Sequence, residues 1–347
     1  MKHLFFIHSH ITFLVAKQYI ADYHINSDDC LFMCFRNYIM PQPFADIYTD
    51  KLFYPQDIYH QTQYRVFSKN IVKAYQNIHI LETAINRYFH NAPFLFYESR
   101  SDALDCISTI ATMTSCQGFY ILEEGTASYT PIENLPQLHK GAKEFIQTLL
   151  LQNILPRFFA LRSSFYAFEN RKYKGTIAIS SNAFRQLPGE RIIVSNPFLQ
   201  QEITPKPDAV LSIDAALLRF FTPQVAEYVY SYIQQNCISK GQKIIAYKFH
   251  PDYYNAPDIQ EQYRIILQKV FQGNLIELPS DVALENVLNT YNVDFYADFS
   301  SVAIYATIMG CKCYSYAHLL TEHFPNTAYQ KMISSYPKMS YELYTFL

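Results

Sequence analysis

Two adjacent carboxylates follow an apolar run of the sequence. Glu123 and Glu124 are the last two residues of the stretch 118–124, and Gly125 and Thr126 come directly after them. Because adjacent residues of a strand point to opposite faces, we expect only one of the two carboxylates to enter a site. A carboxylate placed there is a suitable group to accept a proton from an attacking hydroxyl. Taken alone, however, the pattern better fits a solvated strand end with a turn glycine.

A histidine and a proline end another apolar run. Residues 247–251 read Tyr-Lys-Phe-His-Pro, so His250 follows an expected strand and Pro251 fixes the next backbone angle. An imidazole held rigidly at a strand end can hydrogen-bond a phosphate or donate a proton to a departing one. A capped loop histidine explains the same pattern equally well.

Two serines precede a segment with the pattern of a helix. Residues 302–309 are largely apolar and Gly310 follows them, which predicts a helix with Gly310 just beyond its end. Ser300 and Ser301 would then stand at a helix N-terminus, where backbone N–H groups and the helix dipole favour an anion. A plain serine cap is the common alternative. The strand expected just before, at residues 294–297, favours the anion site.

A fourth pattern, at residues 280–288, lies between the histidine–proline pattern and the serine pattern. Ser280 or Asp281 would cap a short helix whose first turns carry Glu285. The carboxylate of Glu285 could accept hydrogen bonds from ribose hydroxyls. An exposed helix glutamate is the more common explanation.

The elements that position these residues alternate in type. Short apolar runs separated by helical patterns predict parallel sheets with helices on both faces. The expected strands lie at residues 3–9, 30–36, 77–81, 93–98, 118–124, 175–180, 191–195, 243–248, 275–278, 294–297 and 312–316. In such sheets ligands bind beyond the carboxyl ends of the strands, which is where the four patterns lie.

A polar stretch containing Pro188 and Gly189 predicts the domain boundary near residue 190. The expected division is a Rossmann-like domain at residues 1–190 and a second at residues 191–330. A C-terminal segment, residues 331–347, is expected to pack back on the first domain.

The composition excludes some classes of protein. The 347 residues suffice for about two domains, and 28 Lys and Arg against 30 Asp and Glu leave no basic surface for nucleic acid. Seven cysteines, without a Cys-x-x-Cys pair, indicate reduced thiols in a cytosolic protein. A zinc site is the weaker alternative, and no metal is expected.

The sequence contains no segment with the roughly 18 apolar residues of a membrane span. The N-terminal apolar run, residues 4–7, is also too short for a secretory signal. Residues 155–168 combine arginine and phenylalanine and could lie on a membrane surface, although an amphipathic helix packed on the first domain fits better. The expected location is the cytoplasm, with peripheral association at the inner face of the membrane as a separate hypothesis.

In their order along the chain, the four patterns resemble the motif series of bacterial sialyltransferases. Those families carry a D/E-D/E-G motif, an HP motif and a serine motif, and residues 284–288 resemble their ribose-binding helix. The resemblance covers about residues 118–310. Both acidic positions are Glu here, where related enzymes often have Asp, so the acceptor geometry can differ. The resemblance implies a GT-B fold, which consists of two Rossmann-like domains with a cleft between them.

The resemblance also implies a reaction. Sialic acid would pass from CMP-sialic acid to a hydroxyl of a terminal sugar, expected to be galactose, on lipooligosaccharide or capsule, with inversion and without a metal or cofactor. Residues 1–190 would bind the acceptor and residues 191–330 the CMP-sugar. Alternatives are a transferase of the same fold that uses CMP-Kdo or another sugar, and a non-catalytic glycan-binding protein.

The roles of single residues follow from the same resemblance. One of Glu123 and Glu124, with a slight preference for Glu123, would be the general base, and Gly125 and Thr126 would lie on the acceptor side. His250 would contact the phosphate and assist the departure of CMP. The implied CMP-binding residues are Lys248, His250, Pro251, Glu285, Ser300 and Ser301. Lys248 would add positive charge near the phosphate, unless it is an ordinary surface lysine.

Overall fold

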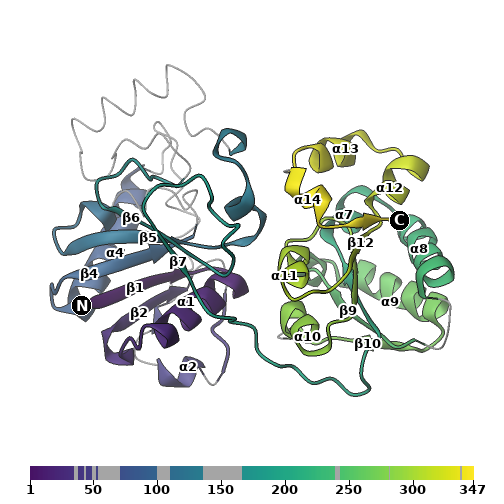
Figure 1. Cartoon of the computed structure of the whole chain (residues 1–347), viewed down its shortest axis with the longest axis horizontal. Helices are drawn as coiled ribbons and strands as arrows, with labels where there is room; N and C mark the ends of the chain where they lie inside the picture. The colour runs from purple at the N-terminus through teal and green to yellow at the C-terminus, as the bar shows by residue number, and fades with distance from the viewer. Residues whose placement is uncertain are drawn as a thin grey trace. The chain divides into compact units, whose positions relative to one another are not determined.

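The chain folds into two compact units, Met1–Pro197 and Phe198–Leu347 (Figure 1). The computed structural model describes residues 1–34, 38–42, 44–48, 52–53, 71–99, 110–135, 166–238, 243–280, 282–336 and 338–347. Each unit has its own sheet, in which every strand pairs in parallel with its neighbours.

The sheet of the first unit has the strand order β3-β2-β1-β4-β5-β6-β7. Its strands are β1 (Lys2–Ile7), β2 (Cys30–Cys34), β3 (Leu52–Phe53), β4 (Phe94–Glu98), β5 (Cys116–Leu122), β6 (Tyr173–Ala178) and β7 (Glu190–Ile193). The helices described in full are α1 (His10–Asp22), α2 (Phe44–Ile47) and α4 (Ile71–Phe89). Strands are added on one side from β1 to β3 and on the other from β4 onward. The carboxyl ends of β1 and β4 therefore form a topological switch point, where such sheets bind ligands.

Residues 77–81 were expected to form a strand, and this expectation is wrong because they lie inside α4. Leu81, Ile85 and Phe89 are each at most 1% exposed and are spaced four residues apart, which is the helical period. The isolated run is too short to reveal that period, since short apolar runs fit a strand or a buried helix turn.

Residues 191–195 were expected to begin the second domain, but β7 pairs with β6 and completes the first sheet. The division between the units falls after Pro197 instead. Gly175 of β6 makes this pairing possible, because a Cβ at that position would lie 1.9 Å from the carbonyl oxygen of Glu190.

Replacing Gly175 by alanine is expected to destabilise the first unit by about 3 kcal/mol, because the β6–β7 pair would have to separate. Urea unfolding followed by circular dichroism measures the change. Gly118→Ala is the matched control, since its Cβ would first meet the side chain of Lys174, which can move. Equal losses in the two variants would contradict the role given to the Gly175–Glu190 contact.

The second sheet has the order β10-β9-β8-β11-β12-β13. As in the first sheet, the side on which strands are added changes once, here between β8 and β11. Its strands are β8 (Ala209–Ile213), β9 (Ile245–Phe249), β10 (Leu275–Glu277), β11 (Asp294–Ala297), β12 (Cys313–Ser315) and β13 (Thr345–Phe346). Its α-helices are α7 (Ala215–Phe220), α8 (Pro223–Tyr232), α9 (Pro257–Phe271), α10 (Leu284–Tyr291), α11 (Val302–Ile308), α12 (Ala317–His323), α13 (Thr327–Ser334) and α14 (Lys338–Glu342).

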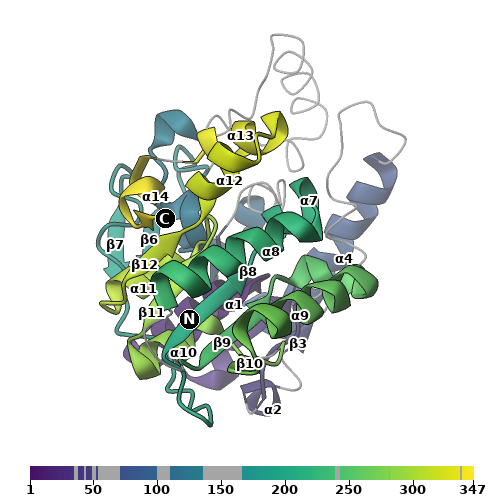
Figure 2. The ribbon, with the colours of Figure 1, turned by 90° about the vertical axis from the view of Figure 1, so that its right-hand side faces the viewer.

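Both faces of the second sheet are covered. Figure 2 shows α8 and α9 lying over one face, and α10 and α11 cover the other. Side chains of β8 alternate between the two cores: Leu211 and Ile213 pack with α8 and α9, while Val210 packs with α10 and α11. This double burial explains why the strands of both sheets read as continuous apolar runs.

The C-terminal segment belongs to the second unit. It was expected to pack back on the first domain, but β13 pairs with β12 and extends the second sheet. Tyr344, just before β13, is buried in the core that α10 and α11 cover. The expected boundary at residue 330 is therefore absent from the structure, where the second unit runs to Leu347.

Two Rossmann-like α/β units in one chain constitute the GT-B fold, so the expected fold class is confirmed. Within the described ranges, no helix has the length and apolar character needed to span a membrane. Most of the stretch at residues 155–168 lies outside the described residues, which resume at residue 166.

Candidate functional site

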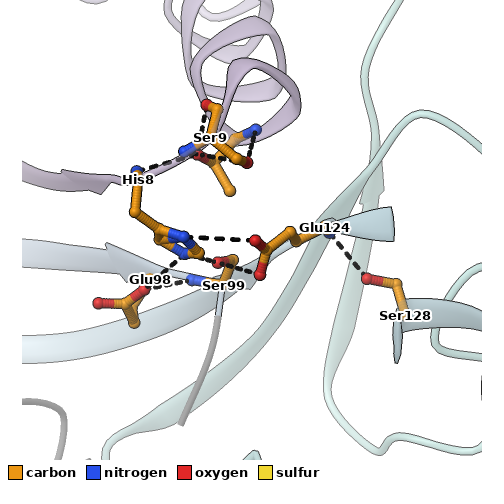
Figure 3. Close-up of polar contacts among 7 residues, drawn as sticks. His8, Ser9, Glu98, Ser99, Glu124 and Ser128 are labelled. Carbon is orange, nitrogen blue, oxygen red and sulfur yellow. Dashed lines mark hydrogen bonds and ion pairs between the residues drawn. The ribbon is translucent and has the colours of Figure 1, made fainter. Parts of the chain in front are cut away.

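Four polar side chains meet at the switch point of the first sheet (Figure 3). His8 follows β1, Glu98 ends β4, Ser99 comes directly after that strand, and Glu124 follows β5. Nδ1 of His8 lies 3.3 Å from Oε1 of Glu124, and its Nε2 is hydrogen-bonded to the Ser99 hydroxyl. Ser99 Oγ also lies 3.2 Å from Oε2 of Glu124. The strand order β1-β4-β5 thus places a carboxylate, an imidazole and a hydroxyl in mutual contact.

Glu123 and Glu124 have different surroundings. Glu123 is fully buried, and its carboxylate accepts hydrogen bonds from Tyr129 Oη at 2.6 Å and from the Ile179 N–H at 2.7 Å. A third donor, the Ser180 N–H, lies at 3.4 Å. The Glu124 side chain is 16% exposed and faces His8 and Ser99. Of the two carboxylates, only that of Glu124 is therefore partly exposed, while that of Glu123 is buried among its donors.

Replacing Glu123 by glutamine is expected to destabilise the first unit by about 2 kcal/mol, because a neutral amide oxygen accepts more weakly than a carboxylate from the Ile179 and Ser180 N–H groups, and the amide nitrogen cannot accept from Tyr129 Oη. The urea midpoint measures this loss. Glu133→Gln, at an exposed glutamate of the same region, is the control and should leave the midpoint unchanged. A Glu123→Gln protein as stable as this control would show that the three hydrogen bonds do not hold the turn.

The turn after Glu124 fixes the position of its carboxylate. Gly125 has a φ of 51°, a left-handed value that glycine adopts without strain, and it begins a 3₁₀ turn, Gly125–Tyr129. The backbone N–H of Glu124 donates to Ser128 Oγ at 2.8 Å, and the Thr126 carbonyl accepts from Thr130 Oγ1 at 2.9 Å. In this structure Gly125 and Thr126 therefore shape the turn.

His250 stands at the carboxyl end of β9 in the second unit. Its backbone N–H donates to the Ile213 carbonyl at 2.9 Å, and its Nδ1 accepts from the Asp252 N–H at 3.2 Å. Pro251 begins the 3₁₀ turn that Nδ1 caps, Pro251–Asn255. Because Nδ1 is an acceptor, a neutral imidazole carries its proton on Nε2. The side chain is 42% exposed.

The ammonium of Lys248 contacts backbone carbonyls of the second unit. It donates to the Ser280 carbonyl at 3.0 Å and to the Val282 carbonyl. These carbonyls belong to the segment leading into α10, whose first turn carries Glu285. Lys248 therefore holds the start of α10 in place.

Glu285 is buried, so the alternative of an exposed helix glutamate is wrong. Burial raises the pKa of its carboxyl, and the nearby Lys248 charge acts in the opposite direction. The helix that carries it is fastened to the start of the unit: Asn286 Oδ1 accepts from the Leu199 N–H at 3.1 Å. The hydroxyl of Thr290 accepts from the Gln201 N–H at 2.6 Å.

The two serines precede α11 as expected, and Gly310 follows it with a φ of 84°. The backbone N–H of Ser300 donates to Tyr344 Oη at 2.8 Å, and Ser300 Oγ accepts from the Val302 N–H at 3.3 Å. The Ser300 N–H is thus used within the fold. What the serines can offer a ligand is the proton of each hydroxyl.

A buried acid pair that was not predicted from the sequence lies at the switch point of the second sheet. Asp214 follows β8 and Asp298 follows β11, and the Asp298 N–H donates to Asp214 Oδ2 at 2.6 Å. Burial and the adjacent Asp214 charge raise the pKa of Asp298 to about 8, and burial raises that of Asp214 as well. The signal for Asp214 was the apolar run Ala209–Ile213 between two aspartates.

The contact of His8 with Glu124 was also missed, although His8 near the end of the expected strand at residues 3–9 and Ser99 directly after the one at residues 93–98 were a usable signal. Among the residues that the structure describes, no group of three or more His, Cys, Asp or Glu side chains is arranged to hold a metal ion.

No family model and no curated sequence matches this chain. Among solved structures it resembles UDP-GlcNAc 2-epimerase from Methanocaldococcus jannaschii, with 12% identity, a TM-score of 0.49, and 96% of this chain and 91% of that chain covered. It also resembles the calicheamicin glycosyltransferase CalG4, with 10% identity, a TM-score of 0.45, and 96% and 84% coverage. A glycosyltransferase from Rickettsia africae ESF-5 gives 10% identity, a TM-score of 0.42, and 90% and 78% coverage. Similarities this distant do not define a substrate or a reaction.

Proposed function

We propose that this chain is an inverting glycosyltransferase that moves a sialic-acid-type sugar from its CMP donor to a hydroxyl of a glycan. The observation that carries the proposal is the Glu124 carboxylate, which lies at the switch point of the first sheet in contact with His8 and Ser99. The order of the Glu-Glu-Gly, His-Pro and Ser-Ser motifs along the chain supports the choice of donor.

In this proposal Glu124 is the general base. It removes the proton of the acceptor hydroxyl while the hydroxyl oxygen attacks the anomeric carbon of the donor sugar. The bond from that carbon to the phosphate oxygen breaks, its electron pair stays on the phosphate, and CMP leaves. Attack from the side opposite the phosphate inverts the anomeric carbon.

The second unit binds CMP in this proposal. The Nε2–H of His250 donates to the phosphate and stabilises the charge that develops on it, and Pro251 fixes the turn that orients the imidazole. The hydroxyls of Ser300 and Ser301 donate to the same phosphate. Glu285 accepts hydrogen bonds from the ribose, and Lys248 acts indirectly by holding the start of α10.

The test incubates the purified chain with CMP-Neu5Ac or CMP-Kdo and galactose-terminated acceptors, and it scores CMP release and product mass. Wild-type transfer from CMP-Neu5Ac is expected to fall by about 10²–10³-fold in His250→Ala, because a donor to the leaving phosphate is lost. His79→Ala, at an exposed histidine of α4, is the matched control.

Each other outcome rejects a part of the proposal. Transfer from CMP-Kdo alone would assign a different donor sugar. Glycan binding without release of CMP, unchanged in Glu124→Gln and His250→Ala, would identify a binding protein that keeps the fold without the chemistry.

A further inference from the structure

The His8 side chain is enclosed by the other members of the cluster in the first unit. Its side chain is 2% exposed and lies between the carboxylates of Glu98 and Glu124 (Figure 3). Its backbone is fixed from both sides, because it follows β1 directly and precedes Ser9, which caps α1. The imidazole is therefore held in one orientation and has limited room to turn away from Glu124.

The contacts of His8, Ser99 and Glu124 form a closed ring. His8 Nε2 bonds to Ser99 Oγ, Ser99 Oγ donates to Glu124 Oε2 at 3.2 Å, and Glu124 Oε1 lies 3.3 Å from His8 Nδ1. Ser99 has a single hydroxyl proton, which the Glu124 contact uses, so the proton in the His8–Ser99 bond belongs to Nε2. A neutral imidazole then has no proton left for Nδ1.

Within the contacts of the described residues, the ring consequently offers a place for an additional proton between Nδ1 of His8 and Oε1 of Glu124. With a neutral His8 and an ionised Glu124, two acceptor atoms face each other at that place. One proton joins them, whether it is counted as an imidazolium beside a carboxylate or as a neutral imidazole beside a carboxylic acid.

We propose that His8 and Glu124 take up the proton of the acceptor hydroxyl as one unit, with His8 as the positioning residue that shares it. This inference rests on the proposed function. The O–H bond of the acceptor breaks as its oxygen bonds to the anomeric carbon, and the proton comes to lie between Oε1 and Nδ1. The electron pair of the broken sugar–phosphate bond leaves with CMP.

The charges around His8 favour this uptake. Glu124 faces Nδ1, and Glu98 Oε1 lies 3.6 Å from Nε2. The Ser99 N–H holds the same oxygen of Glu98 at 2.8 Å, so the second carboxylate is also fixed in place. An imidazolium between two carboxylates is stabilised by both, which strengthens proton binding by the pair relative to Glu124 alone.

The first experiment needs no turnover. The full chain is labelled with ¹⁵N-histidine, the ring signals of His8 are assigned by their loss in His8→Gln, and their titration is followed in wild type and in Glu124→Gln. The proposal expects the midpoint of His8 to fall by about 1 pH unit or more in Glu124→Gln, because coupled groups bind the proton together. Glu123→Gln is the matched control, since Glu123 contacts Tyr129 and the 179–180 backbone. An unchanged His8 midpoint in Glu124→Gln overturns the inference.

The second experiment measures the pH dependence of kcat/KM. The acid limb is expected to move to lower pH by about 1 unit or more in His8→Gln, with kcat about tenfold lower and the KM for the CMP donor unchanged. His8→Gln should also retain more activity than His8→Ala, because an amide can still donate to the carboxylate. A wild-type pH profile in both variants would leave His8 a structural role only. If the wild type uses no CMP-sugar, the proposed function fails, and the NMR titration still decides whether the proton is shared.

Discussion

Replacing Glu124 by glutamine is expected to lower kcat for sugar transfer by about 10²–10⁴-fold, because a positioned general base contributes a factor of that size. The amide has nearly the same shape and can keep one bond to the ring, so the fold should be retained. Initial rates of CMP release with a saturating acceptor measure the loss. Binding of CMP to the second unit, followed by calorimetry, should be unchanged.

Glu123→Gln provides the contrast within the same motif. Its expected loss is in stability, since the Glu123 carboxylate accepts from Tyr129 and from the 179–180 backbone. Glu133→Gln controls for removal of one negative charge. If Glu123→Gln lost transfer at full stability while Glu124→Gln kept it, the assignment of the base to Glu124 would have to be abandoned.

The sequence located most strands because a strand buried on both faces is a continuous apolar run. It predicted where the polar residues after β5, β9 and β11 would stand. It could not show that His8 meets Glu124, because that contact depends on β4 lying between β1 and β5. Strand order is set by how distant segments pack, and a single sequence carries little record of it.

The same limit explains the choice between the two glutamates. Strand alternation predicts that Glu123 and Glu124 face opposite ways, but it does not say which one faces the site. The answer depends on Tyr129 and the backbone after β6, which surround Glu123. The second switch point was missed for a simpler reason: β8 is a five-residue run, with Ser212 interrupting its apolar pattern.

Replacing Asp298 by asparagine is expected to remove much of the pH dependence of stability in the second unit. Burial and the Asp214 charge raise the pKa of Asp298 from 3.8 to about 8. Between these values the folded protein holds a proton that the unfolded chain has released. Stability therefore falls as the pH rises from about 4 to about 8, by an amount on the order of 5 kcal/mol. Asparagine does not ionise, so this loss disappears.

Urea midpoints of wild type and Asp298→Asn test the expectation. They are measured from about pH 4.5 to about pH 8.5, a range that covers most of the titration. The difference between the two proteins is the quantity to follow. Burial lowers the pKa of His3 to about 4, which makes stability rise from about pH 4 to about pH 6.5 in both proteins. Subtraction removes that contribution. Parallel curves for wild type and variant would show that Asp298 does not titrate in this range.

The variant should fold because asparagine keeps the carbonyl oxygen to which Tyr329 Oη donates, at 2.5 Å from Asp298 Oδ1. It also keeps the backbone N–H that donates to Asp214 Oδ2. In the variant Asp214 is the remaining ionisable carboxyl of the pair, and Ser212 and Tyr316 already donate to it. The pH dependence that remains in the variant would then come from Asp214, because burial raises the pKa of that carboxyl as well.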